Sequence, residues 1–151
     1  MEMDAPTRLR SKPSWLLNKA STRAHQLVKE AMATAGAHAY HFAILAAVEE
    51  FGPSSQVQIG QRCGIDQSDM HAMVAELAEQ GHVERAPDPT DRRRNLITLT
   101  EAGRRRLDEW DVTLSAVQDN LCNALSATDR DSLIVLLTRV LGLAEPMRTG
   151  R

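Results

Sequence analysis

The sequence predicts a mainly α-helical, winged helix-turn-helix fold with long helices at both ends. We expect about six helices and a wing of two or three strands. Apolar residues recur at helical spacing over most of the chain, and two of the predicted helices are joined by a glycine-containing turn. A predicted hairpin with a polar, arginine-rich tip follows directly. A length of 151 residues is enough for one domain with a real core, so we expect a single domain over residues 1–151.

The first third of the chain predicts a polar arm and two helices. Residues 1–12 are polar and basic, which indicates a flexible arm. Apolar residues spaced by three and four predict one helix over 14–35, which Gly36 ends. A second helix is predicted over 38–50, and the following glycine and proline at 52–53 end it.

A short helix is predicted next. Ser54 or Ser55 can cap it, and it runs to Cys63 with Val57 and Ile59 among its inward residues. The glycine that follows supplies a tight turn.

The second helix of the pair is predicted over 67–80. Asp66 precedes it and suits its free amides and its dipole. The residues that share one face predict a buried stripe of Met70, Met73, Val74 and Leu77. The opposite face presents Gln67, Ser68, Asp69, His71, Ala72 and Ala75.

The segment 81–103 predicts a β-hairpin followed by a helix start at Thr100. Strand-forming residues flank a turn rich in proline and aspartate over 86–95. Three consecutive arginines, at 92–94, stand at its tip. Contact with DNA phosphates or with a minor groove explains why a loop would hold three guanidinium groups in solvent. We expect Asp91 to orient one of them.

A long helix is predicted over 101–123 and a last one from Ser126 to about 143. The apolar residues of the long helix form a seam with spacings of three and four: Leu107, Trp110, Leu114, Val117, Leu121 and Leu125. The last helix is apolar over an arc wider than one neighbouring helix can cover. We therefore expect a second copy of the chain to cover it.

The overall charge permits a nucleic-acid partner without requiring one. The net charge of −2 argues against a general nucleic-acid binder. However, residues 83–106 hold seven arginines against four acids, a local charge of +3. The two cysteines are far apart in sequence, which favours a reduced, cytoplasmic protein. The chain shows no secretory signal and no apolar run long enough to span a membrane.

The sequence resembles the MarR family of transcriptional regulators. The resemblance is carried by the run DPTDRRR at 88–94 and by LITLTEAG at 96–103, which match the family's D-x-R wing and L-T-x-x-G helix start. The order and lengths of the predicted helices agree with the family from about residue 14 to 143. The wing motif and the upstream helix pair together are a strong indication, whereas either alone would be modest.

The resemblance implies a homodimeric repressor that binds a palindromic operator in double-stranded DNA. Residues 38–100 would form the DNA-binding unit, and 14–35 and 101–143 the dimerisation helices. The helix at Gln67 would enter the major groove, and Arg93 would enter the minor groove. The residues expected at DNA are Ser54, Ser55, Gln56, Gln67, Ser68, Asp69, His71, Ala72, Arg92, Arg93 and Arg94.

The predicted reading helix departs from the family pattern. Family members usually carry Ser, Thr and Arg where this chain has Gln67 to Glu76. An acidic Asp69 is unfavourable near phosphates unless it meets a donor such as the cytosine N4 amine. The departure bears on which operator sequence is read.

Family members are often released from DNA by a small aromatic acid, an oxidant or a metal. For a small ligand the expected contacts are Trp15, Tyr40 and His41. No cofactor or metal site is predicted, because His38 and His41 supply only two ligands. No sequence pattern of a catalytic site supports an enzyme. The alternatives are a winged-helix protein-interaction module and a thiol-based redox sensor that uses Cys63 or Cys122.

Overall fold

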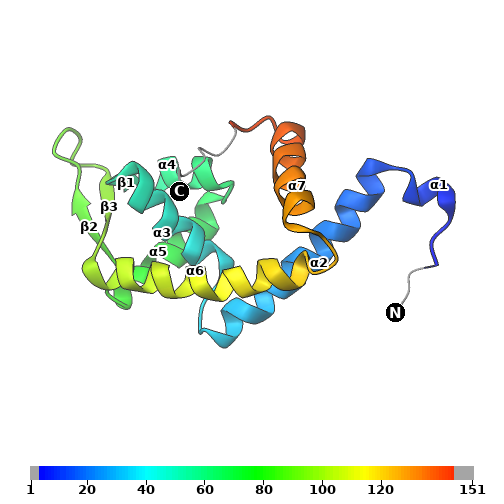
Figure 1. Cartoon of the computed structure of the whole chain (residues 1–151). Helices are drawn as coiled ribbons and strands as arrows, with labels where there is room; N and C mark the ends of the chain where they lie inside the picture. Colours follow the sequence, from blue (N-terminus) through cyan, green and yellow to red (C-terminus); the bar gives the residue numbers. More distant parts are fainter. Residues whose placement is uncertain (1–3, 145–151) are drawn as a thin grey trace. The chain divides into compact units, whose positions relative to one another are not determined.

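The computed structural model describes residues 4–144, shown in Figure 1, and the chain separates into two compact units, Met1–Val117 and Gln118–Arg151. The described residues form seven helices and three short strands, so the prediction of a mainly helical fold is confirmed. The helices are α1 (Thr7–Arg10), α2 (Pro13–Thr34), α3 (Ala39–Phe51), α4 (Gln56–Cys63), α5 (Gln67–Glu79), α6 (Glu101–Leu121) and α7 (Ala127–Val140). The strands are β1 (Ser54–Ser55), β2 (Val83–Pro87) and β3 (Asn95–Leu99).

The prediction of a flexible arm over residues 1–12 is wrong for part of that segment. Thr7–Arg10 forms one helical turn, α1, directly after Pro6. Proline lacks an amide hydrogen and has a fixed φ, so it suits a position just before a helix. Residues 1–3 lie outside the described part of the chain.

The core of the first unit lies between α3, α4 and α5, as the helical spacing predicts. Met70, Val74 and Leu77 of α5 have no exposed surface, and Met73 is half-buried, so the predicted stripe is confirmed. The glycine predicted to form the turn between α4 and α5 ends α4 in the left-handed conformation, with φ +68°. Glycine adopts this conformation without the steric cost of a β-carbon.

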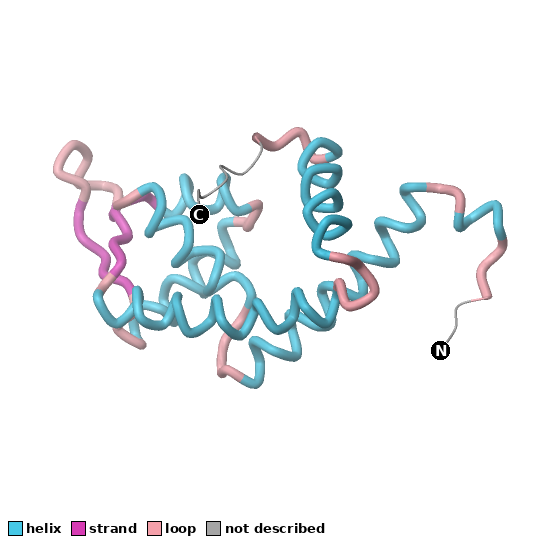
Figure 2. Tube along the Cα trace, viewed as in Figure 1, coloured by secondary structure: helices cyan, strands magenta, loops and turns pink. Residues whose placement is uncertain are grey.

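The sheet has three antiparallel strands in the order β1-β3-β2, drawn in magenta in Figure 2. Val83 of β2 pairs with Leu99 of β3, and Pro87 pairs with Asn95. On the other side of β3, the two-residue strand β1 pairs Ser54 with Ile97. The predicted hairpin is confirmed, and β1 attaches it to the chain between α3 and α4.

The start of α6 lies directly against the end of the α5–β2 connection. Thr100 donates its hydroxyl to the Gly81 carbonyl at 2.6 Å and accepts the Gly103 amide at 3.0 Å. The Thr100 amide donates to the His82 carbonyl at 3.2 Å. A β-carbon on Gly103 would lie 2.0 Å from that same carbonyl oxygen. Glycine at 103 is therefore required by the close approach of two backbones.

The apolar seam predicted on the long helix belongs largely to the core of the chain itself. Leu107 and Trp110 are almost fully buried, and they join the same apolar cluster as the residues of α3 and α5. The helix ends at Leu121 rather than near 123, so Leu125 lies beyond it and is 40% exposed. The first half of the seam is therefore covered within the chain itself, whereas Leu125 at its end is exposed.

In the second unit, α7 begins at Ser126 with a reciprocal cap. The Ser126 hydroxyl accepts the Asp129 amide at 3.1 Å, and the Asp129 carboxylate accepts the Ser126 amide at 3.4 Å. Such a cap satisfies amides that the first helical turn leaves free. Arg130 donates to Asp119 at 2.8 Å, which ties α7 to the last part of α6. The predicted start of the last helix is confirmed, and the helix ends at Val140, before the predicted 143.

Large apolar side chains remain exposed within this single chain. On α2, Leu16 and Leu17 are 48% and 36% exposed. On and just after α7, the exposed residues are Ile134, Leu136, Val140, Leu141 and Leu143. Apolar surface of this extent is typical of a protein–protein contact.

Within residues 4–144, no single helix combines the length and the hydropathy of a membrane span. Only α2 and α3 taken together reach that threshold, across a bend of 85°.

We predict that Gly103→Ala lowers the free energy of unfolding by about 1–3 kcal/mol, because the added methyl would overlap the His82 carbonyl. Glycine to alanine inside an unobstructed helix has the opposite sign and stabilises by roughly 0.5–1 kcal/mol. Chemical denaturation followed by circular dichroism measures the change. A stabilised variant would contradict the close approach.

Candidate nucleic-acid interface

The N-terminal end of α5 is held by the residue that the sequence predicts as its cap. The Asp66 carboxylate accepts the Asp69 amide at 3.0 Å and the Ser68 hydroxyl at 2.7 Å. These two bonds, the amide first, lower the pKa of Asp66, so the cap stays ionised. The carboxylate also faces the positive end of the helix dipole. The first turn of α5 is thus well ordered before any partner binds.

The side chains predicted to read DNA from α5 differ in how far they reach solvent. Ser68, His71 and Ala72 are exposed, whereas Asp69 is half-buried. Gln67 is exposed as a residue, but its amide lies back over α4. A β-carbon on Gly60 would be 2.6 Å from its Nε2 atom. A base contact by Gln67 therefore requires a change of rotamer.

Two of the residues predicted at DNA from the start of α4 are buried. Ser54 and Ser55 are 3% and 4% exposed. The Ser54 hydroxyl donates to the Gly52 carbonyl, and the Ser55 hydroxyl accepts the Gln58 amide to cap α4. Their hydroxyls are therefore used inside the fold, and we do not retain either residue in the interface. Gln56 stays accessible as a half-buried residue at the first position of α4.

A correction also applies to Val57, which the sequence places inward. Its residue is 51% exposed, while Ile59 is fully buried as predicted. The buried face of this eight-residue helix is only two residues wide, at Ile59 and Gly60. Val57 falls outside that narrow face.

The wing tip is organised by Asp88, which the sequence does not single out. Its carboxylate accepts the Thr90 amide at 2.9 Å and the Thr90 hydroxyl at 2.8 Å. The other carboxylate oxygen accepts the Arg94 guanidinium at 2.9 Å. The Thr90 amide above all, and then Arg94, lower the pKa of Asp88 to about 2. This buried carboxylate holds the loop closed and forms an ion pair with Arg94.

Asp91 acts on the backbone of the wing rather than on an arginine side chain. Its carboxylate accepts the Arg93 amide at 3.1 Å. The expectation that Asp91 orients one of the arginines is confirmed at the backbone of Arg93, whereas the guanidinium that meets a carboxylate is that of Arg94, at Asp88. Arg92 and Arg93 are both exposed, and no ion pair to either is present among the described residues. These two arginines carry the outward charge of the wing.

Under α5, a buried histidine connects two helices of the first unit. His41 of α3 lies 2.8 Å from the Glu76 carboxylate of α5. The other ring nitrogen, Nδ1, accepts the His38 amide at 3.0 Å. Nδ1 therefore carries no proton, and the Nε2–H group donates to Glu76. Burial lowers the pKa of His41 despite the raising effect of Glu76.

The three residues expected to contact a ligand do not form one site within the chain. His38 Nδ1 accepts the Tyr40 amide, so both histidines serve in the cap of α3. His41 is 4% exposed and stacks on Trp110 at 6.1 Å between ring centroids. Trp15 lies 19 residues before the end of α2, near which α3 begins. At about 1.5 Å of rise per residue, this separates Trp15 from that end by about 29 Å. The expected grouping of Trp15 with Tyr40 and His41 near one helix junction is therefore wrong within one chain.

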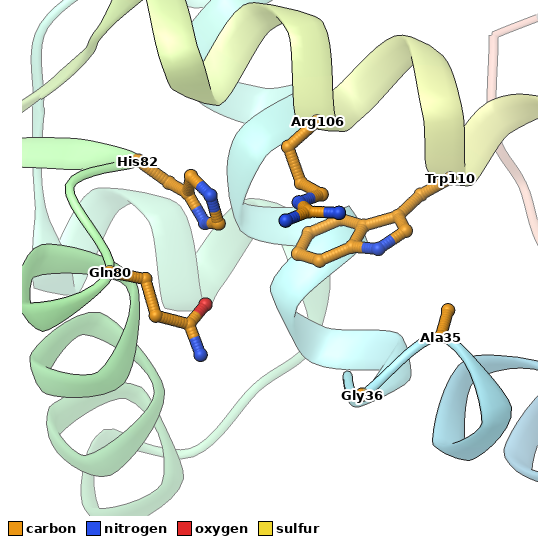
Figure 3. Close-up of a pocket in the computed structure, with 6 residues that line it drawn as sticks. All are labelled: Ala35, Gly36, Gln80, His82, Arg106 and Trp110. Carbon is orange, nitrogen blue, oxygen red and sulfur yellow. The ribbon is translucent and has the colours of Figure 1, made fainter.

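A pocket of about 360 Å³ lies beside Trp110. Figure 3 shows Gln80 and His82 approaching it from the α5–β2 connection, and Arg106 and Trp110 from α6. Ala35 and Gly36, just after α2, complete its wall. Its lining was missed because the sequence does not reveal that the end of α5 meets the first turns of α6.

Cys63 does not have the surroundings of an activated thiol. The Cys63 thiol lies 3.5 Å from the Ala43 carbonyl, and burial raises its pKa, which lowers the fraction of thiolate. Cys122 is half-buried just after α6.

Comparison with known proteins agrees with this geometry. The model of the MarR family matches residues 37–94. The chain is 28% identical to the HTH-type transcriptional repressor NicR of Pseudomonas putida, over 83% of this chain and 80% of NicR. Among solved structures, a probable transcriptional regulator from Pseudomonas aeruginosa is similar with a TM-score of 0.77 and 28% identity, covering 88% of this chain and 99% of that one. PcaV of Streptomyces coelicolor, in complex with its natural ligand, is similar with a TM-score of 0.75 and 26% identity, covering 91% and 97%.

The α3–α5 helices, the three-stranded sheet and the arginine-tipped hairpin define a winged helix-turn-helix protein. Residues 37–94 match the MarR family, and the chain is similar over most of its length to transcriptional regulators.

We predict that Arg94→Ala raises the pKa of Asp88 toward its ordinary value of 3.8. A depressed carboxylate pKa contributes stability that is present above the ordinary value and is lost as the pH falls through about 2. Because Asp88 becomes protonated at a higher pH in the variant, the wing of the variant should begin to lose order at a higher pH than the wing of the parent protein. Carbon-detected NMR titration of the Asp88 carboxyl group measures the shift. Arg92→Ala is the matched control and should leave the titration unchanged; equal shifts in both variants would contradict the ion pair.

Proposed function

We propose that the protein is a homodimeric transcriptional repressor that binds a palindromic operator in double-stranded DNA. The observation that carries the proposal is the preformed wing, in which Asp88 fixes the loop while Arg92 and Arg93 remain free of ion pairs within the described residues. Both arginines are exposed at the tip of the hairpin that follows α5.

A narrow minor groove is the site that best fits Arg93. Guanidinium groups are planar and weakly hydrated, so they enter a groove of strongly negative potential at low cost in lost hydration. The Arg93 amide is held by Asp91, which fixes the position from which the side chain extends. The wing would then bind through charge and groove shape, whereas base identity would be read elsewhere.

The exposed residues of α5 supply the base readout in this proposal. Ser68, His71 and Ala72 reach solvent on the first two turns of the helix. Asp69 is half-buried, and it can accept a hydrogen bond from a cytosine N4 amine in the major groove. The expected contacts are thus Gln56, Gln67, Ser68, Asp69, His71 and Ala72, together with Arg92 and Arg93.

The exposed apolar residues support the dimer. Leu136 and Val140 of α7 are 56% and 65% exposed, and Leu16 of α2 is 48% exposed. A second copy that covers these residues would remove them from water. The two reading helices of the dimer would then be related by a two-fold axis. Two-fold symmetry of the protein implies a palindromic operator.

A small aromatic ligand is the proposed regulator. PcaV, whose structure is similar, was solved with its natural ligand. A ligand shifts DNA binding only if it binds one arrangement of the protein more tightly than the other. Thiol sensing is the weaker alternative, since burial raises the pKa of Cys63 and so disfavours its reactive thiolate.

We predict that Arg93→Ala weakens operator binding by about 1–3 kcal/mol per subunit and leaves the melting temperature unchanged. Arg93→Lys should recover part of this loss, because lysine keeps the charge without the planar group. The slope of binding against salt should become shallower by about one unit per subunit. Titration of an operator selected from genomic DNA, at several salt concentrations, measures both quantities.

Lys29→Ala is the matched control for that experiment, because it also removes one exposed positive charge, from α2 instead of the wing. It should bind the operator like the parent protein. If Arg93→Ala also does so, with the same salt slope, the wing is not a DNA contact and a protein-interaction module becomes the better interpretation.

We predict that Leu136→Glu weakens dimerisation by on the order of 2–4 kcal/mol per dimer, because both copies bring a carboxylate into an apolar contact. The fold of the single chain should persist, since Leu136 is exposed within it. Sedimentation equilibrium at micromolar concentration measures the association. Asp131→Ala, at an exposed position that points away from Leu136 around the same helix, should sediment like the parent. An unaltered dimer in Leu136→Glu would exclude α7 from the interface.

A further inference from the structure

The buried ring of His41 is held by three other residues. Its Nδ1 atom accepts the His38 amide at 3.0 Å, which closes the cap of α3. Its face stacks on Trp110 of α6, with 6.1 Å between the ring centroids and 20° between the planes. Its Nε2 atom lies 2.8 Å from a carboxylate oxygen of Glu76 on α5. The ring therefore joins three helices of the first unit at one point.

His41 offers Glu76 a hydrogen-bond donor of defined direction. Because Nδ1 already accepts a hydrogen bond, the neutral ring carries its proton on Nε2 and donates it to Glu76. Burial lowers the pKa of His41, so the neutral form dominates near pH 7. The side chain of His41 is only 5% exposed. Loss of the Glu76 acceptor would leave a buried donor poorly hydrated, which is unfavourable.

Glu76 adds a directional contact to the apolar face of α5. The stripe of Met70, Val74 and Leu77 is fully buried, but apolar contacts are non-directional and allow a helix to rotate slightly about its axis. A hydrogen bond weakens steeply when its angle departs from the preferred range. The bond between His41 and Glu76 thus restricts the rotation of α5 more sharply than the apolar packing does.

A rotation of α5 at Glu76 would also move the residues proposed to read bases. Glu76 lies seven residues after Asp69 and four after Ala72 in the same helix. At 3.6 residues per turn, these three residues share one side of α5. Because the helix backbone is hydrogen-bonded throughout, Asp69 turns through nearly the same angle as Glu76. The bond at Glu76 therefore fixes the direction in which Asp69 and Ala72 point.

The same bond connects the reading helix to a proposed dimerisation helix. His41 stacks on Trp110, and Trp110 belongs to α6. In a two-fold dimer, any shift of α5 against α6 occurs in both copies in symmetry-related directions. Such a shift changes the separation and the relative orientation of the two reading helices.

We propose that His41 and Glu76 are positioning residues that set the orientation of α5 against α6, and with it the spacing of half-sites that the dimer accepts. Neither residue has to touch DNA for this role. The statement about half-sites rests on the proposed function, whereas the statement about the orientation of α5 does not.

Residual dipolar couplings of the amide groups in α5 and α6, measured without DNA, test the orientation directly. Glu76→Ala removes the acceptor, so its α5 couplings should no longer fit the orientation relative to α6 that the parent shows. Glu76→Gln keeps an acceptor oxygen and should fit that orientation. Glu79→Ala is the matched control, because it removes the same charge from an exposed position on the same helix. It should also fit the parent.

Two substitutions of His41 separate its two hydrogen bonds. Glutamine can place an amide nitrogen near the position of Nε2, so His41→Gln keeps a donor to Glu76. Asparagine can place an oxygen near the position of Nδ1, so His41→Asn keeps an acceptor for the His38 amide and loses the donor. The α5 couplings of His41→Gln should stay closer to the parent. Thermal melting checks that each variant is folded, and the Glu76 variants decide the question if a His41 variant is not, because the Glu76 side chain is 52% exposed.

Operators of altered spacing test the statement about half-sites. An operator selected with the parent from random DNA is remade with one base pair added at its centre, which turns the half-sites by about 35°. The parent should prefer the selected spacing roughly tenfold or more, and Glu76→Ala should lower this ratio by about threefold or more. Glu76→Gln and Glu79→Ala should keep the ratio. The ratio is the measure because loss of a negative charge changes binding to every DNA alike.

The outcomes separate the positioning role from the proposed function. A changed α5 orientation in Glu76→Ala, with Glu79→Ala unchanged, supports the positioning role even if the parent binds no operator, in which case only the proposed function falls. Unchanged couplings in Glu76→Ala, or equal changes in Glu79→Ala, overturn the positioning role whatever the DNA result. A changed orientation with an unchanged spacing ratio overturns the statement about half-sites.

Discussion

The arrangement of the first unit depends on one close approach between backbones. The His82 carbonyl lies against Gly103 at the start of α6, and Thr100 bonds to both Gly81 and Gly103. This junction fixes where α5 ends, where β2 begins and in which direction α6 leaves the sheet. Trp110, two turns further along α6, then reaches the core beside His41 and His82. The L-T-x-x-G motif is therefore a packing requirement of this fold.

Periodicity and capping predicted the elements well because both act locally along the chain. The stripe of Met70, Val74 and Leu77 and the cap at Asp66 follow from residues within one helix. Their burial could be foreseen, since one side of an amphipathic helix must face the core. The sequence could not show which residues of the α6 seam pack inside the chain and which remain exposed. Spacing shows that Leu107 and Val117 share a face, but not which neighbour covers each of them.

The site was predicted less completely than the fold, because its contacts cross the loops. Ser54 is buried by a two-residue strand that is too short to show alternation. Asp88 and Asp91 look equivalent in sequence, yet only Asp88 meets an arginine side chain, because the backbone of the turn brings Arg94 back to it. The pocket at Arg106 joins residues from three distant segments. No local pattern contains that information.

The wing has a further consequence that concerns the entropy of recognition. Asp88 and Asp91 together bond to three backbone or hydroxyl groups of the loop and to one guanidinium. The loop has therefore lost much of its conformational freedom during folding rather than on meeting a partner. Association of a preordered loop costs little further ordering. Binding of the wing to a groove should therefore resemble rigid-body docking, in which only the long arginine side chains change conformation.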